Sequence, residues 1–164
     1  MTFLRHAAVL AAALLLASAA PAWAHTDGGP ELSLVWPAQG TITTGFHPDA
    51  AEPHDGIDIG MLRSLDVTAA ASGLVETVGD ATGFEGYGTI VLVDLGGGFE
   101  ALYAHLSETD VHPGDVVTVG QKLGLAGCTG LCTGTHLHFE MRYRGVPLDP
   151  LSLLPATIAA PEGG

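Results

Sequence analysis

Short stretches of alternating apolar and polar residues follow one another from Trp36 onward, with glycine and proline between them. Alternation with a period of two predicts half-buried β-strands, and the glycine- and proline-rich segments predict turns. Regularly spaced short strands are typical of sandwiches and barrels, so we expect an all-β fold, a compact antiparallel sheet or sandwich-like domain. The predicted strands cover residues 41–46, 56–60, 66–69, 73–78, 89–94, 99–105, 116–117, 122–126 and 136–143.

The last predicted strand carries two histidines on one face. His136, His138 and Glu140 alternate with three apolar residues, so one face enters a core and the other presents both imidazoles, one pleat apart. Two imidazoles directed from a strand into one space suit metal binding or acid–base chemistry. A surface strand with two histidines explains this segment by itself equally well. Glu140 could contact a metal ligand or be an ordinary surface glutamate.

Two further segments add candidate ligands. Asp58 alternates with isoleucines on a short predicted strand, and His54 lies four residues earlier across a glycine-containing turn. Histidine and aspartate at this spacing can converge on one zinc ion, although a turn histidine and a solvated aspartate would look the same. His105 ends another predicted strand and could reach a neighbouring site or lie at the surface. Only the fold can bring segments so far apart in the chain together.

The ends of the chain are predicted to lie outside the domain. Residues 1–24 have a basic start, an apolar run and a small-residue cleavage site, which predicts a secretory signal peptide; an uncleaved anchor is the weaker alternative. We expect a flexible lead over 25–35, one domain over 36–154 and a flexible tail over 155–164. Residues 25–164 suffice for one domain with its own core.

Charge narrows the classes of partner. Cleavage would remove Arg5 alone among the charged residues, which leaves four basic and 18 acidic residues and a formal charge of 4 − 18 = −14. So acidic a chain argues against nucleic acid and anionic membrane surfaces as partners. Cys128 and Cys132 lie close together, and in an exported protein we interpret them as a disulfide that closes a tight loop. A zinc knuckle would normally need a second ligand pair.

These segments together resemble the lysostaphin/LytM-type zinc metallopeptidases, which are endopeptidases of bacterial cell-wall peptidoglycan. The resemblance runs from about Trp36 to Leu154 and rests on His54-x-x-x-Asp58, Tyr103-Ala104-His105-Leu106 and Gly134-Thr135-His136-Leu137-His138-Phe139-Glu140. It implies that His54, Asp58 and His138 bind one Zn²⁺ per chain and that His105 and His136 are the catalytic histidines. It also implies an antiparallel β domain with the metal at the floor of a narrow groove.

The resemblance predicts a zinc-dependent metalloendopeptidase that hydrolyses cross-link or stem peptides of peptidoglycan in the periplasm, the cell wall or the medium. Two alternatives from other classes stay open. One is a non-catalytic module that binds the wall or activates a partner hydrolase, although such relatives typically lack some of the site residues. The other is an exported metal-binding protein without hydrolytic activity, which leaves His105 unexplained. The bond that is cut, the oligomeric state and the need for an activator are not predicted.

Overall fold

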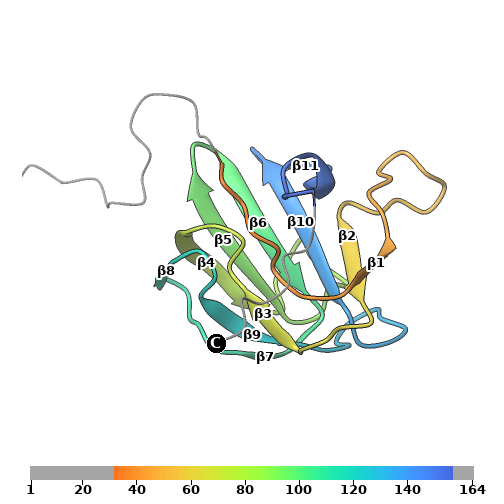
Figure 1. Ribbon diagram of the computed structural model, residues 1–164, viewed down its shortest axis with the longest axis horizontal. Helices are drawn as coiled ribbons and strands as arrows, with labels where there is room; N and C mark the ends of the chain where they lie inside the picture. Colours follow the sequence, from red (N-terminus) through yellow and green to blue (C-terminus); the bar gives the residue numbers. More distant parts are fainter. Residues whose placement is uncertain (1–31, 157–164) are drawn as a thin grey trace, which may run out of the picture.

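Residues 32–156 are described by a computed structural model of the protein (Figure 1). Eleven β-strands and one short 3₁₀ helix make up this part of the chain, and it contains no α-helix. The elements are β1 (Thr41–Thr44), β2 (Ile57–Gly60), β3 (Asp66–Thr68), β4 (Gly73–Gly79), β5 (Ile90–Gly96), β6 (Phe99–Ala104), β7 (Leu106–Thr109), β8 (Val116–Val117), β9 (Lys122–Ala126), β10 (Leu137–Tyr143), β11 (Val146–Leu148) and η1 (Pro150–Ser152).

The strands form two antiparallel sheets. The larger sheet has the order β1-β2-β10-β6-β5-β4-β8, with β11 also paired to β10, and the smaller sheet has the order β3-β9-β7. β10 lies between β2 and β6, although these strands are far apart in the sequence (Figure 1). The all-β, antiparallel prediction is therefore confirmed.

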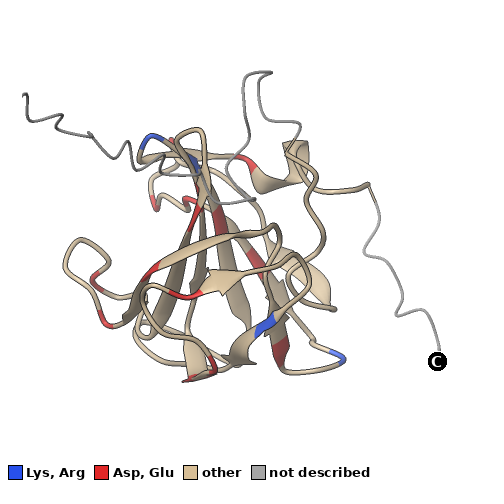
Figure 2. Ribbon diagram, turned by 90° about the vertical axis from the view of Figure 1, so that its left-hand side faces the viewer, with Lys and Arg blue, Asp and Glu red and all other residues tan. Residues whose placement is uncertain are grey.

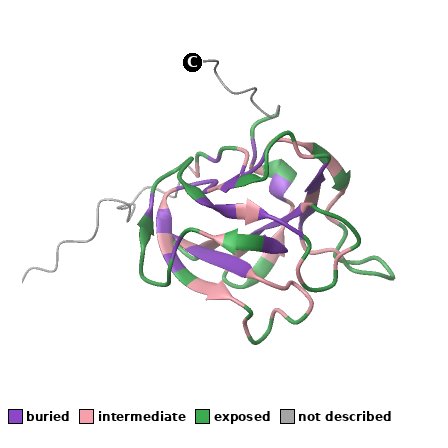
Figure 3. Cartoon of the chain, turned by 90° about the horizontal axis from the view of Figure 1, so that it is seen from below, coloured by how far each residue is buried: buried purple, intermediate pink, exposed green. Residues whose placement is uncertain are grey.

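The main core lies between the two sheets. The larger sheet contributes Ile57, Tyr103 and Phe139, and the smaller sheet contributes Val67 and Leu123, all of them fully buried. Figure 3 shows buried positions along the strands and exposed positions mainly on the loops between them. Burial of this continuous apolar surface supplies the main driving force for folding.

The outer face of the larger sheet is also covered in part, which the alternating pattern did not predict. A second apolar cluster there contains Ile90, Leu92 and Leu102, and Phe84 and Tyr87 from the β4–β5 loop pack against it. β10 is consequently buried on both faces over most of its length. The alternative of a surface strand is wrong, because Tyr87 of this loop packs against His138 and Glu140.

Several predicted strand boundaries need correction. Residues 106–109 and 146–148 form strands β7 and β11 that were not predicted, and Phe46 lies outside β1. β10 and β11 are joined by Arg144 and Gly145, both with positive φ (51° and 77°). This combination is typical of a two-residue hairpin turn, but arginine is rarely its first residue and gave no turn signal. His136 precedes β10 and makes an isolated bridge with Gly127.

The packed region begins before residue 36. Leu34 is buried in the core, and the Val35 amide donates a hydrogen bond to the Ala70 carbonyl. The predicted signal peptide lies outside the described residues, as does most of the predicted tail. Among residues 32–156, no helix is long and apolar enough to cross a bilayer. Acidic residues are spread over this part of the chain and basic ones are few (Figure 2).

Candidate metal centre and active site

The pairing of β2 with β10 places Asp58 directly opposite His138. Residues that face each other on adjacent antiparallel strands project to the same side of the sheet, within reach of each other. His138 Nδ1 lies 3.0 Å from Asp58 Oδ1. Two segments 80 residues apart thus meet because Ile57, Ile59, Leu137 and Phe139 direct their apolar side chains into the core.

His54 completes a group of three possible ligands. It lies before β2 in a bridge with His47, and its Nδ1–H donates a hydrogen bond of 2.7 Å to the Gly45 carbonyl. Its Nε2 lies 3.1 Å from Asp58 Oδ1 and 3.1 Å from His138 Nδ1. One ligand atom from each of the three residues therefore points to a common centre, as their predicted role requires.

The donor set fits a zinc ion. Ligands about 2.1 Å from a tetrahedral Zn²⁺ lie roughly 3.4 Å from each other, close to the separations found here. The second nitrogen of each ring is already a hydrogen-bond donor, His54 to Gly45 and His138 to Glu140. The three convergent atoms are therefore all electron-pair donors, and only a cation or a shared proton between them stabilises the arrangement. Two nitrogens and a carboxylate oxygen suit zinc.

Glu140 holds His138 from the side opposite the proposed metal. It is fully buried, and its Oε1 accepts a hydrogen bond of 3.0 Å from His138 Nε2. The same carboxylate accepts hydrogen bonds from the Tyr87 hydroxyl at 2.6 Å and from Arg142 Nη1 at 2.9 Å. Of the two interpretations of Glu140, the surface glutamate is wrong. A carboxylate behind a metal-binding histidine orients the ring and strengthens its electron-pair donation.

His105 and His136 lie beside this centre and outside the group of three. Their ring centroids are 4.7 Å apart, and His136 Nε2 is 3.6 Å from Asp58 Oδ1. Each ring donates its Nδ1–H to a backbone carbonyl, His105 to Thr129 at 2.8 Å and His136 to Gly134 at 2.7 Å. These hydrogen bonds leave Nε2 of each ring with a free electron pair.

The metal-free site shows strong electrostatic coupling. Burial by itself lowers the pKa of His138, but hydrogen bonds with Asp58 and Glu140 outweigh it and raise that pKa to about 9. Burial by itself raises the pKa of Asp58, but hydrogen bonds with His138 and His54 hold it well below its usual range. A proton on His138 thus takes the place of a cation. Burial lowers the pKa of His105, and its hydrogen bond to Thr129 offsets only part of that shift.

All five predicted residues line one open groove of about 330 Å³. Pro53 and Asp55 lie on one side of it, and Glu85, Tyr87 and Leu131 contribute further walls. The sequence prediction did not include Tyr87, Thr129 or Arg142 in the site. For Arg142 a signal existed, since it follows Glu140 by two residues and so shares its face of the strand. For Thr129 there was none, because its contact with His105 is made by the backbone carbonyl.

Curated proteins with similar sequences are considerably longer than this chain. An uncharacterized metalloprotease of Haemophilus influenzae is 34% identical over 127 residues (73% of this chain, 26% of the relative). The DD-carboxypeptidase/endopeptidase Mpg of Neisseria meningitidis is 39% identical over 100 residues (61% and 22%). The murein hydrolase activator NlpD of Salmonella dublin is 33% identical over 120 residues (73% and 31%). The chain thus spans about a quarter of the length of the first relatives it matches.

Solved structures agree with the fold. A zinc-containing peptidase from Vibrio cholerae superimposes with a TM-score of 0.63 and 32% identity (71% of this chain, 37% of that chain). Lysostaphin from Staphylococcus simulans, an antimicrobial peptidase, superimposes with a TM-score of 0.64 and 26% identity (81% and 61%). The family model of peptidase family M23 matches residues 52–150, which include all five predicted site residues. The resemblance seen in the sequence is confirmed, and the chain belongs to peptidase family M23.

Proposed function

We propose that this chain is a zinc-dependent metalloendopeptidase that hydrolyses peptide bonds of bacterial peptidoglycan. The observation that carries the proposal is the convergence of three ligand atoms from His54, Asp58 and His138, within 3.1 Å of one another, at a groove that His105 and His136 also line. A complete ligand set beside two further imidazoles suits hydrolysis. A module that only binds the wall would need neither.

In this proposal His54, Asp58 and His138 hold one Zn²⁺. Three protein ligands leave one position of a tetrahedral ion open, as is usual for catalytic zinc. Zinc bound there would polarise the carbonyl of the scissile bond and lower the pKa of the attacking water to about 7. Asp58 supplies one negative charge, and Glu140 orients His138.

His105 and His136 supply the proton transfers. The lowered pKa of His105 keeps its ring neutral at neutral pH, and its Nε2 is free to accept a proton from the attacking water. His136 Nε2 is free in the same way. Hydrolysis adds hydroxide to the carbonyl carbon and a proton to the amine that leaves. We assign these transfers and the stabilisation of the developing oxyanion to the two histidines together.

The substrate class is supported by relatives. The Neisseria relative is named as a carboxypeptidase and endopeptidase, and the Salmonella relative as an activator of murein hydrolases. We place the protein outside the cytoplasm because residues 1–24 have the pattern of a signal peptide. The activator name of the second relative makes activation of another hydrolase the competing proposal for this chain.

The test is digestion of purified peptidoglycan by residues 25–164 with zinc, followed by mass analysis of the released fragments. His136→Ala should keep zinc and lose cleavage, and His138→Ala should lose both. His112→Ala is the matched control, since this histidine is exposed and remote from the groove. New peptide ends that appear with the wild type and with His112→Ala, but with neither His136→Ala nor His138→Ala, support the enzyme and identify the bond. A zinc-loaded wild type that releases nothing, yet stimulates a second hydrolase, supports the activator.

A further inference from the structure

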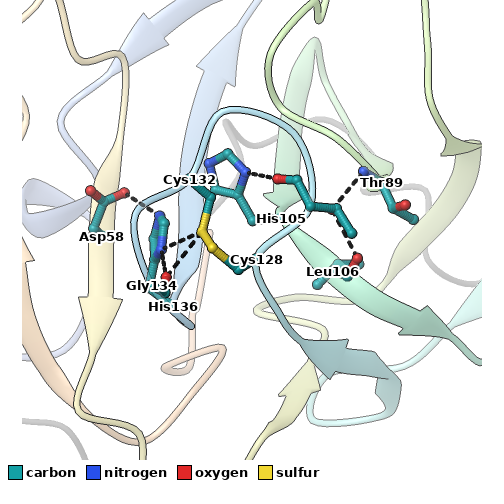
Figure 4. Close-up of a disulfide and its surroundings, with 9 residues drawn as sticks. Asp58, Thr89, His105, Leu106, Cys128, Cys132, Gly134 and His136 are labelled. Atoms are coloured by element: carbon teal, nitrogen blue, oxygen red, sulfur yellow. Dashed lines mark hydrogen bonds and ion pairs between the residues drawn. A yellow bond between two sulfur atoms is a disulfide. The ribbon is translucent and has the colours of Figure 1, made fainter.

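A single short loop holds both histidines that the proposed function assigns to proton transfer. Residues 127–136, of which His136 is the last, connect β9 to β10, and a disulfide between Cys128 and Cys132 closes the loop on itself (Figure 4). His136 lies beside this disulfide, with its Nδ1 3.7 Å from Cys132 Sγ (Figure 4). The loop supplies both acceptors, the Thr129 carbonyl for His105 Nδ1–H and the Gly134 carbonyl for His136 Nδ1–H.

The Thr129 side chain fixes the first of these carbonyls. Its hydroxyl donates a hydrogen bond of 3.0 Å to the Leu106 carbonyl and accepts one of 3.0 Å from the Thr89 amide. Thr129 thereby joins the loop to the residues that follow His105 and Gly88. Because the hydroxyl bonds two backbone groups, its removal would lose both hydrogen bonds.

The far side of the loop packs on the β4–β5 loop. The Leu131 amide donates a hydrogen bond of 2.7 Å to the Gly86 carbonyl. Gly130 lies so close to Gly86 and Gly88 that a β-carbon on it would collide with their backbone atoms. Hydrogen bonds and close packing therefore anchor the loop at two places, and the disulfide fixes the segment between Cys128 and Cys132.

His105 needs such support because its backbone is strained. Its φ of 61° is unusual for a residue with a β-carbon, and it occurs where the chain leaves β6 of the larger sheet for β7 of the smaller sheet. Strained backbone at a functional site persists only where surrounding contacts hold it. The Tyr87 carbonyl accepts a hydrogen bond from the His105 amide, and the Thr129 carbonyl accepts one from the His105 ring.

We propose that the Cys128–Cys132 disulfide and the Thr129 hydroxyl are positioning elements for His105 and His136. They hold both rings as Nδ1–H tautomers, with Nε2 free toward the groove. This inference rests on the proposed function for its effect on turnover. The metal ligands have separate supports, Gly45 for His54 and Glu140 for His138, so the loop governs turnover without governing metal binding.

The test compares the wild type with Cys128→Ser/Cys132→Ser, Thr129→Val, Thr129→Ser and the control Thr135→Val. Thr135 is exposed in the same loop, and its hydroxyl makes no hydrogen bond to any described residue. In the double variant and in Thr129→Val, we expect kcat to fall about tenfold or more, because small misplacements of reacting groups are costly. KM and zinc affinity should stay within about twofold. Thr129→Ser, which keeps the hydroxyl, should retain most of kcat.

Ring ¹⁵N NMR of the metal-free proteins gives a readout independent of turnover. The wild type, Thr129→Ser and Thr135→Val should show His105 as the Nδ1–H tautomer. The double variant and Thr129→Val should show a mixture of the Nδ1–H and Nε2–H tautomers, because the Thr129 carbonyl is then no longer held in place. Thr129→Val keeps the disulfide, so the test survives if the double variant does not fold. An unchanged His105 tautomer in the double variant and in Thr129→Val would overturn the positioning role. So would a loss of zinc affinity that accompanies the fall in kcat. A wild type without cleavage would refute the proposed function, while the NMR result would still decide the tautomer.

Discussion

His138 uses its two ring nitrogens for two different purposes. Nδ1 faces His54 and Asp58, and Nε2 donates to the buried carboxylate of Glu140, which Tyr87 and Arg142 also contact. Burial removes water as a competing partner, so each of these hydrogen bonds is stronger than it would be at the surface. The chemistry of the site thus depends on the Glu140 carboxylate, which is fully buried and does not line the groove.

Glu140→Gln tests this support. Glutamine can still accept from His138 Nε2, but it lacks the charge, and its amide group would face the Arg142 guanidinium. We expect zinc affinity to fall about tenfold to a hundredfold, the usual effect of losing such a partner. Chelator competition measures the zinc affinity, and Glu108→Gln at an exposed position of β7 is the control. Equal zinc affinity in both variants would mean that the Glu140 carboxylate serves only Tyr87 and Arg142.

The raised pKa of His138 predicts how the metal-free protein responds to pH. A raised pKa stabilises the folded state fully below the unfolded value of 6.5, and this contribution is lost as the pH rises through about 9. The free energy of unfolding should therefore fall between these values, by up to about 3 kcal/mol. Urea unfolding in a chelator measures it. His138→Gln should lack this component, and a pH dependence shared by both proteins would contradict the assignment.

At the scale of elements, the close approach of the segment before β2 to β10 positions the three proposed metal ligands. A β-carbon on Gly56 would collide with the Phe139 carbonyl oxygen, and it would also meet Glu140 Cγ at 2.9 Å. Gly56 lies between His54 and Asp58, so the absence of a side chain lets both approach His138. The interior of such a sheet tolerates little displacement because it is closely packed.

Gly56→Ala should consequently destabilise the fold by about 2 kcal/mol or more, the typical cost of overpacking. Zinc affinity should fall as well, because the ligands separate. Gly45→Ala is the matched control, since a β-carbon there meets no atom within 4 Å and the carbonyl that holds His54 is kept. Denaturant unfolding and chelator competition give the two quantities. Gly56→Ala with the stability of the control would show that β10 moves easily.

At the scale of the whole molecule, the proposed metal centre would link parts of the chain that are distant in sequence. His54 and His138 lie 84 residues apart, and a ligand that binds only the folded state stabilises it by mass action. The apolar core between the sheets supplies the rest of the stability and does not depend on metal. Removal of the metal should therefore weaken the fold without abolishing it.

Thermal unfolding with zinc and with a chelator tests this expectation. Free zinc at a thousand times its Kd should add about 4 kcal/mol and raise the midpoint. His138→Ala should show no such rise, and its midpoint should not depend on the chelator. A chelated wild type that is fully unfolded at room temperature would show instead that the fold requires its metal.

The sequence by itself determined the class of fold and the identity of the candidate residues. Period-two alternation predicted most of the strands, because side chains alternate between core and outer face along each strand. Residue types with the right coordination chemistry marked His54, Asp58 and His138. β7 and β11 escaped, although strands as short as β3 and β8 were predicted. β7 follows β6 after His105 alone, and β11 contains Pro147, which argues against a strand.

Only the tertiary structure decided which of these residues meet. The register that places Asp58 opposite His138 depends on pairing between distant strands, which local pattern does not encode. The burial of Glu140 depends on the loop that covers β10, and the alternating pattern alone would place this residue in solvent. Thr129 contacts His105 through its backbone carbonyl, which every residue possesses, and its hydroxyl bonds backbone groups of Thr89 and Leu106 that are distant in the sequence, so its type gave no signal. Long-range pairing and backbone contacts are properties of the folded chain, and side-chain chemistry is a property of the sequence.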